Sequence, residues 1–240
     1  MQLDVESLSH RYGPTQALTR IHLRVKPGQF HALLGRNGAG KTTLFGLLTR
    51  LLHIQSGDIR FDGISLTHHA AEVMKKLGVV FQQNALDLDL SVDQNLHYHA
   101  ALHGLSRGVA RARIDSELAR FDLSSHQHRL VRTLNAGHRR RIELARALIH
   151  KPSFLLLDEP TAGLDAESRH LLVRHVHELC SEQAITVLWA THLFDEIHPD
   201  DNVFILDNGQ LLKEGPARTL IPAYKEQVLG LIPKHGGTTV

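Results

Sequence analysis

The chain has 240 residues, of which 42% are hydrophobic and 22% are charged, and its formal net charge is +2. This length suits one large domain, or a domain with a smaller lobe, and allows a hydrophobic core that needs no disulfides. The composition excludes a disordered chain, and the small positive charge is too weak to indicate a nucleic-acid partner.

The first ten residues, MQLDVESLSH, contain acids and no apolar run, so they do not predict a secretory signal. No uncharged segment approaches the roughly 20 residues needed to cross a bilayer. Cys180 is the only cysteine, which excludes an internal disulfide and fits a reducing compartment. We expect a chain that is soluble by itself and that reaches a membrane only through a partner.

Two segments near the N-terminus alternate between apolar and polar residues, at 21–25 and at 58–61. Pro27-Gly28 ends the first of them. Alternation of this kind is typical of half-buried strands. The two segments therefore predict a small antiparallel sheet in this part of the chain.

Three later segments are continuously apolar, at 30–35, 154–158 and 185–190. Runs of this kind are typical of parallel strands covered on both faces by helices. Helical patterns follow them at 41–52, 166–182 and 193–198. Alternation of strand and helix predicts an α/β fold built on a parallel sheet.

Residues 86–150 differ from the flanking segments, because they have helical periodicity and no buried strand. They predict a helical subdomain inserted into the α/β core, with Ser91 as the cap of its first helix. The run Arg139-Arg140-Arg141 is interpreted as a solvated helix face. Near the C-terminus, 202–207, the turn Asn208-Gly209 and 210–215 predict a hairpin. We place the main domain at 1–220 and expect a short helix and a frayed tail at 221–240.

The strongest motif is GRNGAGKTT at residues 35–43, which matches the phosphate-binding loop G-x-x-x-x-G-K-[ST]. A strand precedes it and an apolar helix follows it, so a chance match in a glycine-rich turn is disfavoured. The backbone N–H groups of such a loop surround phosphate, the lysine binds the β and γ phosphates, and the Thr42 hydroxyl is a Mg²⁺ ligand. The predicted nucleotide-binding residues here are Gly35, Arg36, Asn37, Gly38, Ala39, Gly40, Lys41, Thr42 and Thr43.

Asp158 and Glu159 lie where the buried strand 154–158 ends. Ligands of parallel sheets gather at the carboxyl ends of the strands. Asp158 is therefore predicted to hold Mg²⁺ through water, and Glu159 to polarise the water that attacks the γ-phosphate. Alone, the pair could equally cap the next turn. The presence of the phosphate-binding loop in the same chain favours the metal site.

Together with further motifs, the two sites above make residues 2–220 resemble the ATP-binding cassette (ABC) transporter ATPases. The match is supported by six motifs that occur in the order found in that family. Tyr12 matches the aromatic residue that stacks on adenine, Gln82 the glutamine that contacts Mg²⁺ and the membrane partner, and His192 the switch histidine at the γ-phosphate. LNAGH at 134–138 matches the signature, and TAGLD, which ends at Asp165, matches the D-loop. Singly, each of these residues could be explained by packing.

The resemblance implies a head-to-tail dimer, most simply of two identical chains, that binds two ATP molecules with Mg²⁺ between them. Each ATP would touch the phosphate-binding loop of one chain and the signature of the other. The residues implied across the dimer are Asn135, Ala136, Gly137, His138 and Asp165. Separate membrane-spanning permease subunits would dock on residues 82–95, which places the chain on the cytoplasmic face of a bacterial inner membrane.

The signature departs from the family pattern LSGGQ at three positions. Asn135 replaces serine but can also donate a hydrogen bond and cap a helix. Ala136 replaces glycine, which is harmless if its φ is negative. His138 replaces glutamine and makes the local charge depend on pH. Because Lys41, Asp158, Glu159 and His192 are all present, we expect an ATPase with catalytic residues Glu159, His192 and Lys41.

A narrower resemblance points to the drug and efflux branch of the family and to ABC ATPases associated with pyrroloquinoline-quinone-dependent alcohol oxidation, which favours an exporter. Two alternatives stay open: a regulatory cassette that binds ATP with little turnover, and a soluble ABC protein acting on ribosomes or DNA. The second usually carries two cassettes or a long coiled-coil insertion, and this chain has neither.

Histidine is abundant, with 19 residues in the chain. His97, His99 and His103 share one predicted helix, and the last two are four residues apart, a spacing that can chelate a metal. His126 and His128 form a less convincing pair. With no carboxylate or thiol evident beside them, a bias of surface composition is the preferred interpretation.

Overall fold

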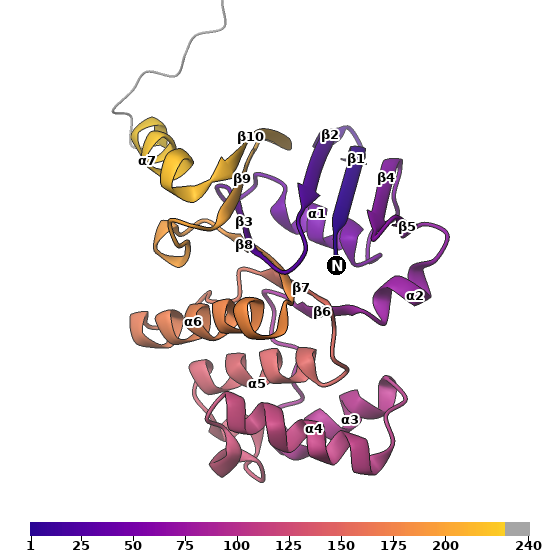
Figure 1. Ribbon diagram of the computed structural model, residues 1–240, viewed down its shortest axis with the longest axis vertical. Helices are drawn as coiled ribbons and strands as arrows, with labels where there is room; N and C mark the ends of the chain where they lie inside the picture. The colour runs from indigo at the N-terminus through magenta and orange to yellow at the C-terminus, as the bar shows by residue number, and fades with distance from the viewer. Residues whose placement is uncertain (229–240) are drawn as a thin grey trace, which may run out of the picture.

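The computed structural model describes residues 1–228, and in it two β-sheets lie above a layer of helices (Figure 1). The first sheet has four antiparallel strands in the order β2-β1-β4-β5. The second has six strands in the order β10-β9-β3-β8-β7-β6, all parallel except β10. The α/β class and the parallel sheet are as predicted.

The antiparallel sheet contains both segments predicted from alternation, and two more strands. Its strands are β1 (Leu3–Tyr12), β2 (Thr15–Val25), β4 (Ser56–Phe61) and β5 (Ile64–Ser65). Strand β1 was not predicted, because its register against β2 shifts between Val5 and Leu8, and Ser7 there has a φ of 49°. The bulge moves the buried side chains out of strict alternation, so the sequence of this strand shows no period of two.

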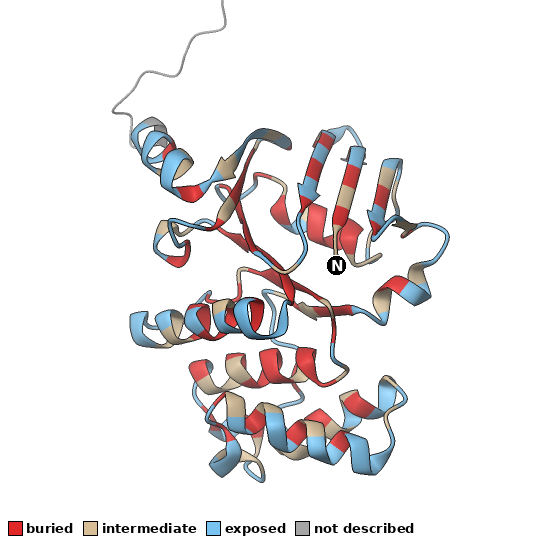
Figure 2. Cartoon of the chain, viewed as in Figure 1, coloured by how far each residue is buried: buried red, intermediate tan, exposed pale blue. Residues whose placement is uncertain are grey.

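The parallel sheet forms the buried centre of the molecule, as the red strands of Figure 2 show. Its strands are β3 (Phe30–Leu34), β6 (Leu77–Val80), β7 (Phe154–Asp158), β8 (Thr186–Thr191), β9 (Asn202–Asp207) and β10 (Gln210–Pro216). The three predicted central strands are confirmed. Strand β6 has only four residues, one of them glycine, and is too short to be recognised from its sequence. A Cβ at Gly78 would lie 2.6 Å from the Ala147 carbonyl oxygen.

Helices cover both faces of the parallel sheet. Helix α1 (Lys41–Leu48) packs between the two sheets, and α6 (Ala166–Gln183) covers the opposite face (Figure 1). Within residues 1–228, the other α-helices outside the inserted segment are α2 (Ala70–Met74) and α7 (Ala217–Val228). Part of the predicted C-terminal helix is thus confirmed, although it begins at 217; residues 229–240 lie outside the described part of the chain.

The helix predicted at 193–198 is wrong. The structure has only a 3-10 turn, Phe194–Glu196, at this position. Its last residue, Glu196, is fully buried, and its carboxylate accepts hydrogen bonds from Thr161 Oγ1 and Trp189 Nε1. These side-chain hydrogen bonds organise the segment, and nothing in the local spacing of apolar residues reveals them.

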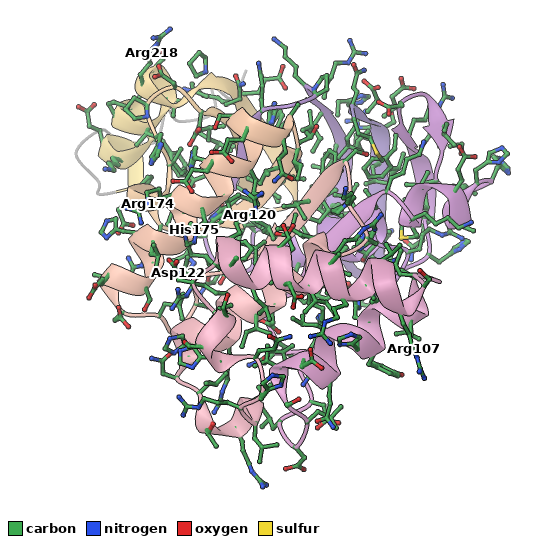
Figure 3. The ribbon with its side chains drawn as sticks, turned by 60° about the horizontal axis from the view of Figure 1, so that its bottom comes forward. Arg107, Arg120, Asp122, Arg174, His175 and Arg218 are labelled. Carbon is green, nitrogen blue, oxygen red and sulfur yellow. The ribbon has the colours of Figure 1, made fainter. Side chains whose placement is uncertain are left out.

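The inserted segment contains three α-helices and two 3-10 turns. The α-helices are α3 (Val92–Leu102), α4 (Arg107–Arg120) and α5 (Ala136–Leu148), and the turns are Ser124–His126 and Val131–Thr133. The predicted cap is confirmed: Ser91 Oγ accepts from Gln94 N, and Ser91 N donates to Gln94 Oε1, a reciprocal pair at the start of α3. The C-terminal end of α4 lies against α6, where Arg120 pairs with Glu182 at 3.4 Å and Phe121 meets His175 edge to face (Figure 3).

The hairpin between β9 and β10 is confirmed, and Asn208 and Gly209 have φ angles of 45° and 72°, as a tight turn of this hand requires. Among residues 1–228, no helix combines the length and the apolar character that crossing a membrane demands.

Candidate nucleotide-binding and hydrolysis site

The loop between β3 and α1 has a shape that two of its glycines make possible. Gly40 caps α1 with a φ of 108°, and a Cβ there would lie 2.8 Å from Leu18 Cδ2. A Cβ at Gly35 would lie 2.4 Å from the Leu206 carbonyl oxygen. The loop is therefore pressed against β2 and β9, and the backbone N–H groups at the start of α1 are left for an anion.

Lys41 is 4% exposed and points back into this loop. Its Nζ donates to the carbonyl oxygens of Gly35 at 2.8 Å and Arg36 at 3.3 Å, and it lies 3.1 Å from Glu159 Oε1. The ammonium group is thus held at the site by carbonyls and one carboxylate. Phosphate oxygens can take over these contacts, because a buried ammonium binds an anion strongly.

Asp158 lies at the end of β7 with 1% exposure. Burial raises the pKa of its carboxyl group, a hydrogen bond from Thr42 lowers that pKa, and the charge of Glu159 raises it again. Its Oδ1 is buried and has no hydrogen-bond partner within residues 1–228. A buried carboxylate oxygen without a partner, beside a threonine hydroxyl, is the donor set that Mg²⁺ prefers, so these residues fit the ion.

Glu159 and His192 follow the adjacent strands β7 and β8. Glu159 has a φ of 45°, and its N–H donates to the Ala190 carbonyl oxygen at 3.0 Å. Glu159 Oε1 lies 3.5 Å from His192 Nδ1 as well as close to Lys41 Nζ. The three predicted catalytic side chains therefore meet around one carboxylate oxygen.

An open cleft of about 600 Å³ lies in front of these groups. It brings together eight of the predicted residues: Asn37, Gly38, Gly40, Lys41, Thr42, Thr43, Gln82 and Glu159. Tyr12 is not part of this lining; it stands at the end of the β1–β2 hairpin opposite Thr15, is 49% exposed, and its ring meets that of His10 edge to face. Five more predicted residues are next to the lining but not part of it: Gly35, Arg36, Ala39, Asp158 and His192.

Five other residues line the cleft that no sequence motif assigned to the site: Thr15, Gln16, Ala17, Asn208 and Gly209. Two backbone hydrogen bonds of Gly209 place these segments at the cleft. Its N–H donates to the Ala39 carbonyl oxygen at 2.9 Å, and its own carbonyl oxygen accepts from Thr19 N at 2.8 Å. The β9–β10 turn therefore clamps the phosphate-binding loop against β2, a contact between segments far apart in the chain.

The signature residues form the start of α5. Asn135 is its N-cap, and its Oδ1 accepts from His138 N at 2.8 Å. Ala136 is in the first turn with negative φ, so the substitution of glycine introduces no backbone strain. Burial first, and then the charge of Arg141, lower the pKa of His138, which keeps the ring neutral near pH 7.

Gly137 is needed for a contact within the chain. A Cβ at this position would lie 2.7 Å from Ser168 Oγ on α6. Ser168 also donates from its N and Oγ to the Asp165 carboxylate, at 2.8 and 3.0 Å, which caps α6 and lowers the pKa of Asp165. Ser168 thus contacts both the signature and the D-loop, so the two motifs lie side by side on one surface. None of the five residues implied across the dimer lines the cleft described above.

Arg140 contradicts the expectation of a solvated arginine run, because it is only 7% exposed. Its guanidinium donates to the carbonyl oxygens of Phe81 at 2.7 Å, Glu159 at 3.2 Å and Pro160, and to Glu143 Oε2 at 2.6 Å. Glu143 Oε1 in turn accepts from Ala85 N at 2.7 Å. The signature helix is therefore connected to the backbone of Glu159 and to both sides of Gln82. Charged residues in a helical pattern predict an exposed face, so this buried network could not be predicted from the sequence.

Residues 18–162 match the family model described as "ABC transporter", which is more than half of the chain. The chain belongs to the ABC transporter ATP-binding family. It is an ATPase subunit that powers a membrane transporter, as the resemblance of its motifs implied.

The cassette is similar to several curated proteins. It is 38% identical to the daunorubicin resistance ATP-binding protein DrrA3 of Streptomyces coeruleorubidus, over 91% of this chain and 69% of that protein. It is 32% identical to the ABC transporter ATP-binding protein NatA of Bacillus subtilis, over 90% and 89%. It is 35% identical to the Nod factor export ATP-binding protein I of Ralstonia nicotianae, over 91% and 68%.

Solved structures agree on the fold. The structure of cbiO1 from Clostridium perfringens, part of the ABC transporter complex cbiONQ, superposes with a TM-score of 0.83 at 32% identity and covers 95% of this chain and 93% of that one. The dimeric structure of MJ0796, a bacterial ABC transporter cassette, gives a TM-score of 0.81 at 23% identity over 91% and 100%.

Proposed function

We propose that this cassette works as a head-to-tail pair of identical chains, with an ATP molecule in each of two shared sites. The observation that carries the proposal is the separation of the motifs. Lys41 and Glu159 line the cleft, whereas the signature and Asp165 form a different surface of the same chain. An ATP in the cleft would leave its γ-phosphate uncovered on the outer side. The free N-terminus of α5 from a second chain supplies the positive potential needed there.

Each group around the proposed γ-phosphate has a separate task. Lys41 and the N–H groups of the loop bind and orient the phosphates. Asp158 and Thr42, with Gln82 at the rim, would hold Mg²⁺, which offsets the charge that develops on the phosphate oxygens. Glu159 orients and polarises the attacking water, and His192, 3.5 Å from it, fixes the position of that carboxylate.

We propose that the altered signature still supports turnover. Ala136 has negative φ, and Asn135 caps the helix through its Oδ1, which leaves its amide NH₂ free to donate to phosphate. The phosphate-facing potential comes mainly from backbone N–H groups at the start of α5, which the side-chain changes do not remove. These observations favour hydrolysis over a regulatory cassette that only binds ATP.

We further propose that the transport direction is export and that the domain spans 1–220, with 86–150 as its helical subdomain. Two of the reported relatives are named for drug resistance and for Nod factor export, which supports export. The proposed docking segment at 82–95 has Leu88 42% exposed, and Tyr98 and Leu102 on α3 are 65% and 67% exposed. Exposed apolar side chains in and just after this segment favour a membrane-spanning partner at the cytoplasmic face. Association with pyrroloquinoline-quinone systems stays a prediction.

Glu159→Gln is the variant that tests this proposal, with Glu72→Gln, an exposed acid of α2, as its matched control. We expect Glu159→Gln to bind ATP but to release phosphate at least about 100-fold more slowly, because removing a general base costs that much. Size-exclusion chromatography with ATP and magnesium should then show a dimer for Glu159→Gln and mostly monomer for Glu72→Gln. Equal hydrolysis by Glu159→Gln and wild type would contradict the assignment of Glu159.

The partner is tested by co-expression. The cassette should co-purify with one candidate permease in detergent, and the complex should hydrolyse ATP. Binding to nucleic acid that weakens as salt is raised would instead favour a soluble ABC protein.

A further inference from the structure

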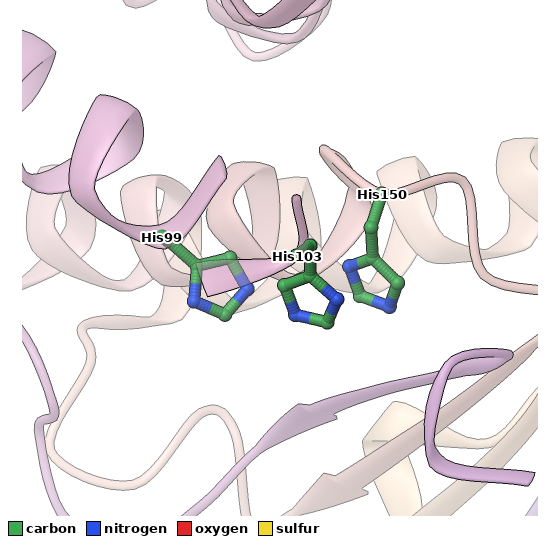
Figure 4. Close-up of side chains that lie close together, drawn as sticks. All are labelled: His99, His103 and His150. Carbon is green, nitrogen blue, oxygen red and sulfur yellow. The ribbon is translucent and has the colours of Figure 1, made fainter. Parts of the chain in front are cut away.

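Three histidines from two distant parts of the chain meet beside the helical subdomain. His99 lies in the last turn of α3, His103 is its C-cap, and His150 follows the end of α5. One ring nitrogen from each lies within 4.8 Å of the others (Figure 4). The rings of His103 and His150 are nearly parallel, with centroids 3.9 Å apart, and those of His99 and His103 are 4.7 Å apart.

A hydrogen bond orients one of these rings, and two of the rings have a buried nitrogen that is left to bind a cation. His150 Nε2 lies 2.9 Å from the Leu77 carbonyl oxygen, so this nitrogen carries the proton and Nδ1 has a free lone pair. His150 Nδ1 and His99 Nε2 are both buried, and neither has a hydrogen-bond partner in the described part of the chain. A histidine oriented by a backbone carbonyl through its other nitrogen is the usual arrangement around bound metals.

We propose that His99, His103 and His150 form a binding site for a transition-metal ion of the Zn²⁺ class, separate from the Mg²⁺ at ATP. A triangle of nitrogens with sides of 4.8 Å has its centre about 2.8 Å from each corner, and Zn–N bonds are about 2.0–2.1 Å. Side-chain rotations that move each nitrogen by about 1 Å, and that tilt the stacked rings of His103 and His150 out of parallel so that both face the ion, close this difference. All three residues are partly exposed, so water can occupy the fourth position of a tetrahedral site.

The surroundings of the three histidines lower their pKa values. Burial, followed by the charge of Arg146, lowers the pKa of His99 to about 3, and burial lowers the pKa of His150 to about 4 and that of His103 below its ordinary value. The imidazoles are therefore neutral near pH 7, and protons do not compete with a metal. Nitrogen ligands without carboxylate disfavour Mg²⁺ and Ca²⁺ and favour Zn²⁺, Cu²⁺ or Ni²⁺.

Two arginines and two helix ends also act on a cation in this site. The Arg146 guanidinium donates to the Ala85 carbonyl oxygen and the Arg113 guanidinium to the Ile149 carbonyl oxygen, at 2.6 and 3.0 Å. These fixed positive charges oppose the ion. The C-terminal ends of α3 and α5, from which the three histidines come, carry partial negative charge and favour it.

A bound ion would link segments that are far apart in the sequence. It would tie the end of α3 to the α5–β7 connection and, through the carbonyl of Leu77, to strand β6. Metal occupancy would therefore brace the helical subdomain against the core sheet.

The test is calorimetric titration of untagged, chelator-washed full-length protein with Zn²⁺, and the same titration with Co²⁺ followed by visible absorption. His103→Gln and the double variant His99→Gln/His103→Gln remove ligands. His97→Gln is the matched control, since it lies on the same helix and is bonded to Asp93 outside the cluster. We expect one tight Zn²⁺ per wild-type chain, a visible Co²⁺ spectrum typical of four-coordination, and a metal-dependent rise in Tm.

Both ligand variants should lose the Co²⁺ spectrum and the rise in Tm. Their Zn²⁺ affinity should fall by more than about 100-fold, because even outer-shell partners of metal sites are worth 10–100-fold. His97→Gln should behave like wild type. Wild-type protein that binds Zn²⁺ no more tightly than the double variant, or a His97→Gln variant that loses as much affinity, would overturn the proposal.

Discussion

Replacement of Arg140 by methionine tests the buried network that joins the signature helix to the catalytic loop. Methionine has a similar volume but cannot donate a hydrogen bond. Glu143, which is 1% exposed, would keep its carboxylate charge with only the Ala85 N–H as a partner. Breaking a buried ion pair in this way costs about 3–5 kcal/mol. The carbonyl oxygens of Phe81 and Glu159 would also lose their donor.

The assay is urea unfolding, followed by the fluorescence of Trp189, the only tryptophan, and by far-ultraviolet circular dichroism. We expect Arg140→Met to lower the free energy of unfolding by about 3–5 kcal/mol with an unchanged m-value. The double variant Arg140→Met/Glu143→Met removes both charges, so it should be more stable than the single variant although it makes fewer hydrogen bonds.

ATP hydrolysis should fall in both variants, because the backbone of Glu159 loses its support. A loss of less than about 1 kcal/mol for Arg140→Met would refute the reasoning, since a loss of that size is typical of an exposed charge pair. A double variant whose loss equals the sum of the two single variants would show that the two side chains do not interact.

Three further predictions concern other parts of the cassette. Gly137→Ala should destabilise the fold by about 1–3 kcal/mol through its clash with Ser168 Oγ, and Ser168→Gly should restore most of the loss in thermal unfolding; no rescue would show that the contact is not the cause. Leu88→Glu should abolish co-purification with the permease and leave ATP binding intact, whereas unchanged co-purification would place the docking surface elsewhere. Burial lowers the pKa of His177. The hydrogen bond to Asp201 at 3.0 Å and the charge of that carboxylate raise it by more, so the net shift of the pKa is upward. A group with a raised pKa stabilises the fold fully below its ordinary pKa of 6.5 and stops doing so as pH rises through the raised value. The stability difference between wild type and His177→Gln should therefore be largest in mild acid and shrink toward alkaline pH, and a difference that grows with pH would contradict the assignment.

The features that were predictable from sequence are those whose cause is local. The phosphate-binding loop needs particular glycines next to a strand, the Ser91–Gln94 capping pair lies within four residues, and Asn208-Gly209 supplies two positive φ angles in succession. In each case a short stretch of sequence determines the backbone geometry.

The features that were missed depend on contacts between distant segments. The bulge at Ser7 hides strand β1, and Arg140 looks exposed until Phe81 and Glu159 are seen to supply its acceptors. His150 is 47 residues from His103 along the chain, so the spacing of His99 and His103 could suggest a pair but not the third ring. A sequence pattern reports which face of an element is apolar, but not which polar groups meet when elements pack.

The shared ATP site is tested most directly by mixing two inactive variants. Lys41→Ala disables the phosphate-binding loop. Ala136→Asp places a negative charge where the phosphate of the partner chain should lie, at an exposed first-turn position where aspartate does not disturb the helix. Ala136→Ser is the control for the second change and should stay active.

In a mixed dimer of these two variants, one site has an intact loop from one chain and an intact signature from the other. Random pairing makes about half of the dimers mixed, with one intact site of two, so the mixture should recover about one quarter of wild-type ATPase activity. Recovery to that level, with each variant inactive alone, is the result that the head-to-tail account predicts. A mixture as inactive as its two components, or an Ala136→Asp variant that is fully active by itself, would contradict it.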